Sequence, residues 1–358
     1  VVFLHEGLGS VAMRDSKSGP WPQALCAALD CPGLVYSRQG YGLSAGIEDV
    51  RGTGRHGPDF MHRQAWQVLP ELLAQSGIEN AVLVGHSDGG TIALLHAARH
   101  AVAACVVMAP HVKVEAVSIE SIEAAQEAYL KGDLRARLAR FHRDVDVAFW
   151  QWCDVWLSPS FRDFDIRPIC REITAPVLAL QGSDDIYGTL AQINEIEPQG
   201  VIERCVVPAC GHSPHRDQRA VVTESITRFC ASTCQLFGTE PAPLARRQVG
   251  GQFKAAYARA VQALHRIADS GEHAFDLVVL AFGQRQGQRV GACDVSLLSA
   301  PGLPLTRTMH TSEQARDLLW ADHLFANDLI DLGYMVLGRG HAVNQGAVIT
   351  EKIGRAHV

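Results

Sequence analysis

One short segment constrains the fold more than any other part of the chain. Residues 81–84 (Ala-Val-Leu-Val) read as a buried strand, and the Ala- and Leu-rich residues 89–98 read as a helix. Between them lies Gly85-His86-Ser87-Asp88-Gly89, a G-x-S-x-G pattern. A serine in so sharp a turn adopts a strained backbone, and the residues two before and two after it pass too close to other atoms for a Cβ. The pattern therefore predicts that the Ser87 hydroxyl stands at the end of a strand, beside a helix N-terminus that favours negative charge.

The rest of residues 1–232 alternates short apolar runs with helical patterns. Continuous apolar runs are typical of strands that are buried on both faces of a parallel sheet. We therefore expect an α/β fold, with a mostly parallel sheet and helices on both faces. The expected strands are 1–4, 33–37, 81–84, 104–108, 176–180 and 203–207, and the clearest helices are 65–76 and 89–98.

One long interval, between the strands at 104–108 and 176–180, interrupts this alternation. It contains no strand signal, and an insertion of this length in an α/β enzyme is best interpreted as a helical lid, here about residues 111–172. The expected lid helices are 118–130, 134–142 and 145–157.

An aromatic stripe marks the last of these lid helices. Phe149, Trp152 and Trp156 are spaced three and four residues apart, which places them on one helix face. Such a stripe either packs the lid onto the core or forms an apolar wall for the acyl part of a substrate.

A reactive serine needs a general base, and the base needs a carboxylate that orients it. Asp184 and Asp185 follow the strand at 176–180, and His212 and His215 follow the strand at 203–207. The order Ser, Asp, His is that of the nucleophile-elbow enzymes. His212 is our expected base because it follows a glycine directly in its loop, and His215 is the second candidate.

A glycine-containing loop, His5-Glu6-Gly7-Leu8-Gly9, follows the first strand. A backbone N–H in such a loop can point toward the substrate oxygen that becomes negative during the reaction. The second donor is expected to be the backbone N–H of Asp88, the residue after the serine.

Together these motifs resemble the α/β-hydrolase superfamily, over about residues 1–232. The first loop is similar to the family's His-Gly-x-x-Gly oxyanion loop, with Glu6 where Gly is usual, and the resemblance implies that Gly7 supplies an oxyanion N–H. The family's Gly-x-x-Asp signature implies that Asp185, rather than Asp184, is the acid. Residues 38–44 (Arg-Gln-Gly-Tyr-Gly-Leu-Ser) resemble the turn after the family's next strand.

The family core normally begins with two further strands, ahead of the strand that leads into the oxyanion loop, and this sequence opens directly on that last strand, at 1–4. The resemblance therefore implies an N-terminal truncation, which leaves the sheet with an open edge.

Composition argues against several classes of partner and ligand. The net charge of −6 does not favour nucleic acid or anionic membranes as partners, and no run reaches the roughly 18 apolar residues of a membrane-spanning helix. The ten cysteines are scattered without a CxxC pair, so we expect reduced thiols in a cytoplasmic protein. His310, His323 and His341 lack metal-ligand spacing, and we expect neither a metal nor another cofactor.

The sequence changes character after residue 234. Residues 235–251 contain two Pro, two adjacent Arg and a Gly-Gly, and read as a linker. Residues 252–352 show helix and strand patterns of a small α+β region that resembles no family we recognise. Residues 353–358 read like a translated sequencing adapter, so we expect them to lie outside the fold. The expected hydrolase domain is therefore residues 1–234, with 252–352 dispensable for its chemistry.

The expected function is that of a serine hydrolase. It would act on a small-molecule carboxylic ester or related acyl compound through an acyl-enzyme on Ser87. The motifs do not separate esters from thioesters or carbon–carbon bonds, so a thioesterase or a C–C bond hydrolase is the alternative within the same fold. A non-hydrolytic binding protein is the alternative from another class.

Overall fold

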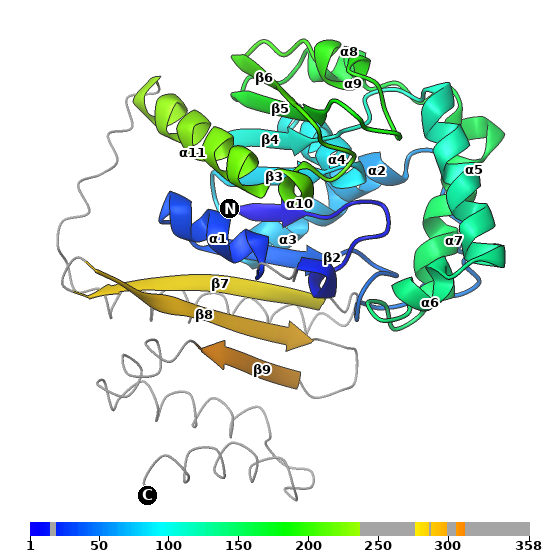
Figure 1. The fold of residues 1–358 in the computed structure, drawn as a ribbon, viewed down its shortest axis with the longest axis horizontal. Coiled ribbons are helices and arrows are strands. Elements are labelled where there is room, and N and C mark those ends of the chain that lie inside the picture. Colours follow the sequence, from blue (N-terminus) through cyan, green and yellow to red (C-terminus); the bar gives the residue numbers. More distant parts are fainter. Residues whose placement is uncertain (15–18, 237–275, 286–287, 299–305, 312–358) are drawn as a thin grey trace, which may run out of the picture.

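The computed structural model of this protein describes residues 1–14, 19–236, 276–285, 288–298 and 306–311. Figure 1 shows a central sheet with helices on both of its faces. Six neighbouring strands of this sheet run parallel to one another, in the order β6-β5-β4-β3-β1-β2. The expectation of a mostly parallel α/β sheet is confirmed. These strands are β1 (Val2–Leu4), β2 (Gly33–Ser37), β3 (Val82–His86), β4 (Ala104–Met108), β5 (Val177–Gly182) and β6 (Ile202–Val207).

Two hydrophobic cores form because successive side chains of a strand point to opposite faces of the sheet. In β3, for example, Leu83 belongs to one core and Val84 to the other. The core around Val84 is covered by α1 (Trp21–Leu29) and α11 (Arg219–Leu236). The core around Leu83 is covered by α2 (Phe60–Arg63), η2 (Gln64–Val68), α3 (Leu69–Gln75), α4 (Asp88–Ala97) and α9 (Ala191–Asn194).

The predicted helix at 65–76 is part of a longer helical segment that begins at Phe60. Its middle turn, η2, is a π-helix, and α3 follows with Pro70 in its first turn. Proline has no N–H to donate to the preceding turn, which explains why a regular α-helical ladder is interrupted there.

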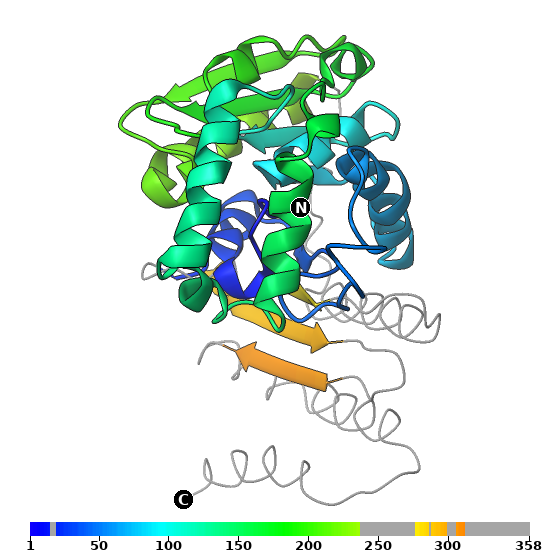
Figure 2. The same cartoon turned by 90° about the vertical axis from the view of Figure 1, so that its right-hand side faces the viewer.

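The predicted lid is a set of helices between β4 and β5. Figure 2, which views the molecule from the lid side, shows α5 and α7 in front of the sheet. The predicted helix at 134–142 is shorter than expected, because His142 leaves the helix and bonds to two core loops: its Nδ1 accepts from the Gly42 N–H, and its Nε2 donates to the Leu8 carbonyl. The lid elements are α5 (Ala116–Lys131), α6 (Leu134–Leu138), α7 (Val145–Trp156), η3 (Pro159–Phe161) and α8 (Arg167–Cys170).

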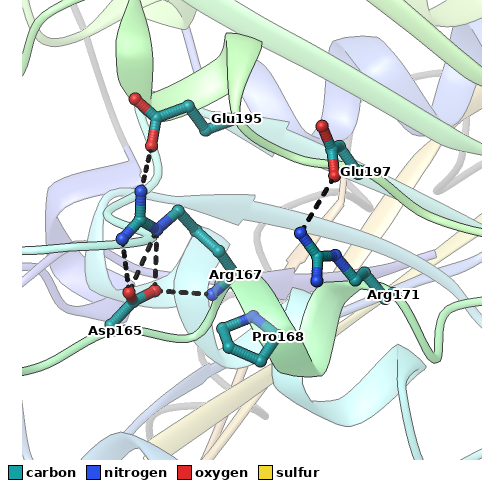
Figure 3. A pocket seen from close by; sticks show the side chains of 6 residues that line it. All are labelled: Asp165, Arg167, Pro168, Arg171, Glu195 and Glu197. Atoms are coloured by element: carbon teal, nitrogen blue, oxygen red, sulfur yellow. Dashed lines mark hydrogen bonds and ion pairs between the residues drawn. The ribbon is translucent and has the colours of Figure 1, made fainter.

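The two ends of the lid lie beside each other. Lys113 and Asp165 form an antiparallel bridge, with the Ile166 N–H donating to the Val112 carbonyl at 2.8 Å. Figure 3 shows Arg167 paired with both Asp165 and Glu195, and Lys113 also pairs with Glu195. This ion-pair network fastens the base of the lid to the segment that follows α9.

Three further strands extend the same sheet. β7 (Asp276–Arg285) pairs antiparallel with β2, and β8 (Gln288–Leu298) and β9 (Thr306–Thr311) follow it. The sequence predicts an open sheet edge, and at β2 this expectation is wrong, because β7 pairs with β2 there. The apolar pattern of residues 289–298 predicts a strand, and β8 occupies these residues. The first two residues of the predicted linker, Gln235 and Leu236, belong to α11, while residues 237–251 and 353–358 lie outside the described residues.

In the part of the chain that the structure describes, no helix has the combination of length and apolarity needed to cross a membrane.

Candidate active site

Ser87 occupies the turn between β3 and α4. Its backbone has φ 53° and ψ −121°, the strained conformation that the sequence pattern predicts. A Cβ on Gly85 would overlap the backbone of Gly89, and a Cβ on Gly89 would overlap the Leu4 carbonyl. Only glycine fits at these two positions, so the pattern holds the serine at the carboxyl end of β3.

His212 and Asp185 form a hydrogen-bonded chain with this serine. The Ser87 Oγ lies 2.9 Å from His212 Nε2, and His212 Nδ1 lies 2.9 Å from both carboxylate oxygens of Asp185. The side chain of Asp185 is 1% exposed and that of His212 is 17% exposed. Asp185 also accepts from the Tyr187 N–H and the Gln181 side-chain amide, which fixes its orientation.

The protonation states of this chain follow from its surroundings. Burial raises the pKa of Asp185, but hydrogen bonds from His212 and Tyr187 outweigh burial and hold the pKa below its ordinary value. Burial lowers the pKa of His212, and Asp185 offsets only part of that shift. At neutral pH Asp185 is therefore ionised and His212 is neutral, which leaves an imidazole nitrogen able to accept the serine proton.

The alternative base and acid lie elsewhere. The His215 ring packs against Trp21 and His86, at the start of α10 (Pro214–Asp217). The Asp184 carboxylate accepts from its neighbour Ser183. The structure thus brings His212 and Asp185, rather than His215 and Asp184, to the serine.

The loop after β1 is anchored through one carbonyl oxygen. The Glu6 carbonyl accepts from His5 Nδ1 at 2.7 Å, from Arg38 Nη2 at 3.0 Å and from the Gly9 N–H at 3.1 Å. None of the described residues accepts a hydrogen bond from the Gly7 N–H. Asp88 opens helix α4, so its N–H has no partner within the helix. Neither expected oxyanion donor therefore has a hydrogen-bond acceptor among the described residues.

The aromatic stripe of α7 divides between two environments. Trp152 packs directly against Gly7, and Trp156 Nε1 donates to Asp88 Oδ1 at 3.2 Å. Phe149 instead stacks on Tyr129 of α5, with ring centroids 3.7 Å apart. Two of the three predicted pocket residues therefore contact the candidate oxyanion residues, while the third packs inside the lid.

The Asp88 carboxyl group is fully buried. Burial raises the pKa of Asp88 to about 6, although the Arg38 charge and the hydrogen bond from Trp156 lower it in part. Since the indole N–H donates to the carboxylate, ionised Asp88 favours contact between α7 and the serine turn.

A second histidine connects the loops around the serine. His86 Nε2 donates to the His212 carbonyl at 2.6 Å, and its Nδ1 lies 3.5 Å from Glu6 Oε2. Sequence reasoning did not identify His86, Glu6 or Arg38 as parts of this network. The available signal was their position, since each stands at or just beyond the end of a predicted strand, near the edge where Ser87 is expected.

Metal ligation has no support among the residues that the structure describes, where no group of three or more His, Cys, Asp or Glu side chains is suitably arranged. His323 and His341 lie outside the described residues, as does the side chain of His310.

The described geometry suits nucleophilic attack on an acyl carbon. The serine hydroxyl lies within hydrogen-bond distance of a neutral imidazole, and the imidazole lies within hydrogen-bond distance of an ionised carboxylate.

The chain is similar to several solved structures at low sequence identity. An enol-lactonase from Burkholderia xenovorans LB400 is 19% identical with a TM-score of 0.48, over 64% of this chain and 90% of that chain. A meta-cleavage product hydrolase from Pseudomonas fluorescens IP01 is 16% identical with a TM-score of 0.50, over 65% of this chain and 90% of that chain. A hydrolase from Pseudomonas aeruginosa PA01 is 18% identical with a TM-score of 0.46, over 64% of this chain and 88% of that chain.

Sequence comparison gives the family directly. No curated protein sequence matches the chain. The sequence model described as "Alpha/beta hydrolase family" matches residues 1–224, which include Ser87, Asp185 and His212. On this match and the fold described above, the chain belongs to the alpha/beta hydrolase family.

Proposed function

We propose that this protein is a serine hydrolase that cleaves a small-molecule carboxylic ester or a related acyl compound. The observation that carries the proposal is the continuous chain from Ser87 Oγ through His212 to Asp185, with 2.9 Å at each link. These three side chains come from three separate strand ends, so their meeting is not a consequence of local sequence.

The first half of the proposed reaction forms the acyl-enzyme. Ser87 Oγ attacks the acyl carbon while His212 Nε2 takes the hydroxyl proton, and the carbonyl oxygen becomes an oxyanion held by the N–H groups of Gly7 and Asp88. The tetrahedral intermediate collapses, the bond to the leaving group breaks, and His212 returns its proton to the departing alcohol.

The second half releases the acid. Water attacks the acyl carbon and gives a proton to His212, the Ser87–acyl bond breaks, and the serine recovers its proton. The ionised Asp185 stabilises the imidazolium in both halves. Neither half requires a metal or another cofactor in this proposal.

Substrate and location are further parts of the proposal. Trp152 and Trp156 beside Gly7 and Asp88 support an apolar acyl group on a small molecule. Free thiols support the cytoplasm as the location, and they include Cys105, Cys153, Cys170, Cys205 and Cys210.

A fluorophosphonate probe and an ester assay test the proposal. The probe should label the wild-type protein at Ser87, and Ser87→Ala should abolish both labelling and hydrolysis of short aryl esters while circular dichroism is unchanged. Ser160→Ala, which removes an exposed lid hydroxyl, is the matched control and should retain both signals. Undiminished hydrolysis in Ser87→Ala would refute the proposal.

The same assay distinguishes the alternatives. A matched panel of an ester, a thioester and a vinylogous diketone with the same acyl group compares oxygen, sulfur and carbon leaving groups. The proposal predicts the highest kcat/KM for the ester. A higher value for another member would keep the serine mechanism and replace the carboxylester assignment, while binding without turnover of any member would favour a binding protein.

A further inference from the structure

The loop that carries Gly7 is held by a side chain from another strand end. Arg38 directly follows β2, and its guanidinium donates to two successive backbone carbonyls, those of His5 and Glu6. Arg38 is only 3% exposed, so its guanidinium group bonds to these carbonyls in the interior of the protein and not to solvent. A planar guanidinium suits this task because its donors are fixed relative to one another.

The ring of His5 reinforces the same anchor. The Arg38 N–H donates to His5 Nε2 at 3.0 Å, and His5 Nδ1 lies 2.7 Å from the Glu6 carbonyl oxygen. Since Nε2 accepts, Nδ1 must carry the ring proton and donate it to that carbonyl. Arg38 therefore acts on the Glu6 carbonyl twice, directly through its side chain and indirectly by fixing the tautomer of His5.

Peptide geometry transmits this anchoring to Gly7. The bond between Glu6 and Gly7 is trans, so the Gly7 N–H points away from the Glu6 carbonyl in one rigid plane. A carbonyl fixed toward Arg38 thus fixes the Gly7 N–H in the opposite direction. Hydrogen bonds to the carbonyl also polarise the peptide, which makes its N–H a stronger donor.

We propose that Arg38 is a positioning residue that orients the Gly7 N–H as an oxyanion donor. The inference rests on the proposed function, because it needs an oxyanion to be formed on Ser87. Arg38 touches no reacting atom in this proposal. Its effect should therefore appear where negative charge develops on the substrate oxygen, and not where the substrate first binds.

Two substitutions separate charge from geometry. Arg38→Lys keeps the positive charge but cannot hold two carbonyls in one plane, and Arg38→Gln removes the charge. Arg204 offers a matched control, because its guanidinium also donates to two backbone carbonyls, those of Ile193 and Ile196, beside α9. Arg204→Lys and Arg204→Gln therefore report the cost of losing such an anchor elsewhere in the fold.

The measurement compares two inhibitors of the same shape. A trifluoromethyl ketone adds reversibly to Ser87: Oγ bonds to the ketone carbon, His212 takes the serine proton, and the ketone oxygen becomes an oxyanion. The corresponding trifluoromethyl alcohol has no carbonyl to attack and forms no oxyanion. The ratio of their affinities thus isolates oxyanion stabilisation from binding of the rest of the molecule.

Both Arg38 variants should lower kcat for an aryl ester by about 10- to 100-fold. Removal of a whole oxyanion donor lowers kcat by about 10²- to 10³-fold, and a donor that is only misoriented should cost less. The affinity for the ketone should fall by a similar factor, while the affinity for the alcohol should stay within about twofold of wild type, a small change on the scale of binding free energies. The Arg204 variants should change neither affinity.

Several outcomes would overturn the inference. They are full activity in Arg38→Lys, a fall in kcat without a parallel loss of ketone affinity, or an equal loss in the Arg204 variants. If Arg38→Gln does not fold, the kcat and the ketone affinity of Arg38→Lys alone test the inference. If the wild-type protein neither labels at Ser87 nor binds the ketone more tightly than the alcohol, the proposed function itself fails, which is a distinguishable result.

Discussion

At the scale of single residues, the turn at Ser87 shows how a sequence can specify strain. A non-glycine residue at φ 53° is held there only when its surroundings prevent relaxation, at a cost of about 1–3 kcal/mol. Gly85 and Gly89 provide the close backbone contacts that make this conformation possible. The backbone of the turn thus fixes the direction in which the Ser87 side chain leaves the chain.

The two neighbouring aspartates allow a sharp test of the acid. Asp185→Asn should lower kcat of ester hydrolysis by up to about 10⁴-fold, because an amide in the orienting position favours the wrong imidazole tautomer. Asp184→Asn should change kcat by less than about threefold, since the hydrogen bond that this carboxylate makes within the described residues is to the neighbouring Ser183 hydroxyl. Steady-state kinetics on both variants check the assignment, and equal losses or the reverse order would contradict it.

The pH dependence of kcat/KM follows from the lowered pKa of His212. The base must be neutral, so the rate should fall as pH drops through the His212 pKa, which lies below its ordinary value of 6.5. Asp185 raises that pKa, so the residual activity of Asp185→Asn should show its acid limb at still lower pH. A wild-type limb above pH 6.5, or an upward shift in the variant, would count against the assignment.

At the residue scale, the sequence predicts the position of a side chain best where that side chain belongs to a local pattern. Ser87, Asp185 and His212 each stand in a short motif after a buried strand, and the structure brings them together. Arg38 donates to backbone carbonyls, which every residue has. The sequence therefore contains no side-chain pattern that predicts which residues Arg38 contacts. Its role becomes visible only once the strand ends are placed in three dimensions.

At the scale of elements, strand positions were predicted more closely than helix ends. β2 and β4 have the predicted bounds, because a buried strand is delimited by its own apolar run. The predicted helix at 134–142 instead ends at Leu138, since His142 finds hydrogen bonds in core loops that are distant in sequence. Tertiary contacts decide such an end, and the local pattern does not contain them.

Helix α7 should depend on its N-cap. The Asp144 carboxylate accepts from the backbone N–H groups of Asp146 and Val147, so Asp144→Ala should lower the free energy of unfolding by about 1 kcal/mol. Asp133 precedes α6 without a capping hydrogen bond and makes an exposed ion pair with Arg137, so Asp133→Ala should cost less than about 0.5 kcal/mol. Denaturant unfolding of both variants measures the difference, and equal losses would contradict the capping role.

At the scale of the whole molecule, the C-terminal strands extend the sheet beyond β2. β7 pairs with β2 over Gly33–Ser37, and all candidate catalytic residues lie before residue 232. The sequence predicts the strands at 275–282 and 289–298 but not where they pair, because strand pairing at long range leaves no periodic signal. The separation of the hydrolase domain from residues 252–352 stays a prediction.

Deletion of everything beyond residue 240 should leave the catalytic rate unchanged and lower the solubility of the protein. The shortened protein should keep the wild-type kcat per fluorophosphonate-labelled serine, because the deletion removes no candidate catalytic group. It should aggregate at lower temperature, since the edge of β2 loses its partner. Active-site titration with ester kinetics, followed by light scattering during heating, tests both parts. A shortened protein that is folded by circular dichroism yet inactive would contradict the prediction.

The antiparallel bridge between the two ends of the lid has a consequence for the evolution of this protein. The chain leaves the core at Lys113 and returns to it at Asp165, two residues that are paired to each other. The core therefore has to accommodate the same two neighbouring ends whatever lies between them, and each doubling of the connecting length costs only about 0.6 kcal/mol of closure entropy. The paired ends therefore set where a lid of any length begins and ends, while the bonds of His142 and Trp156 to the core set which parts of this lid cannot change freely.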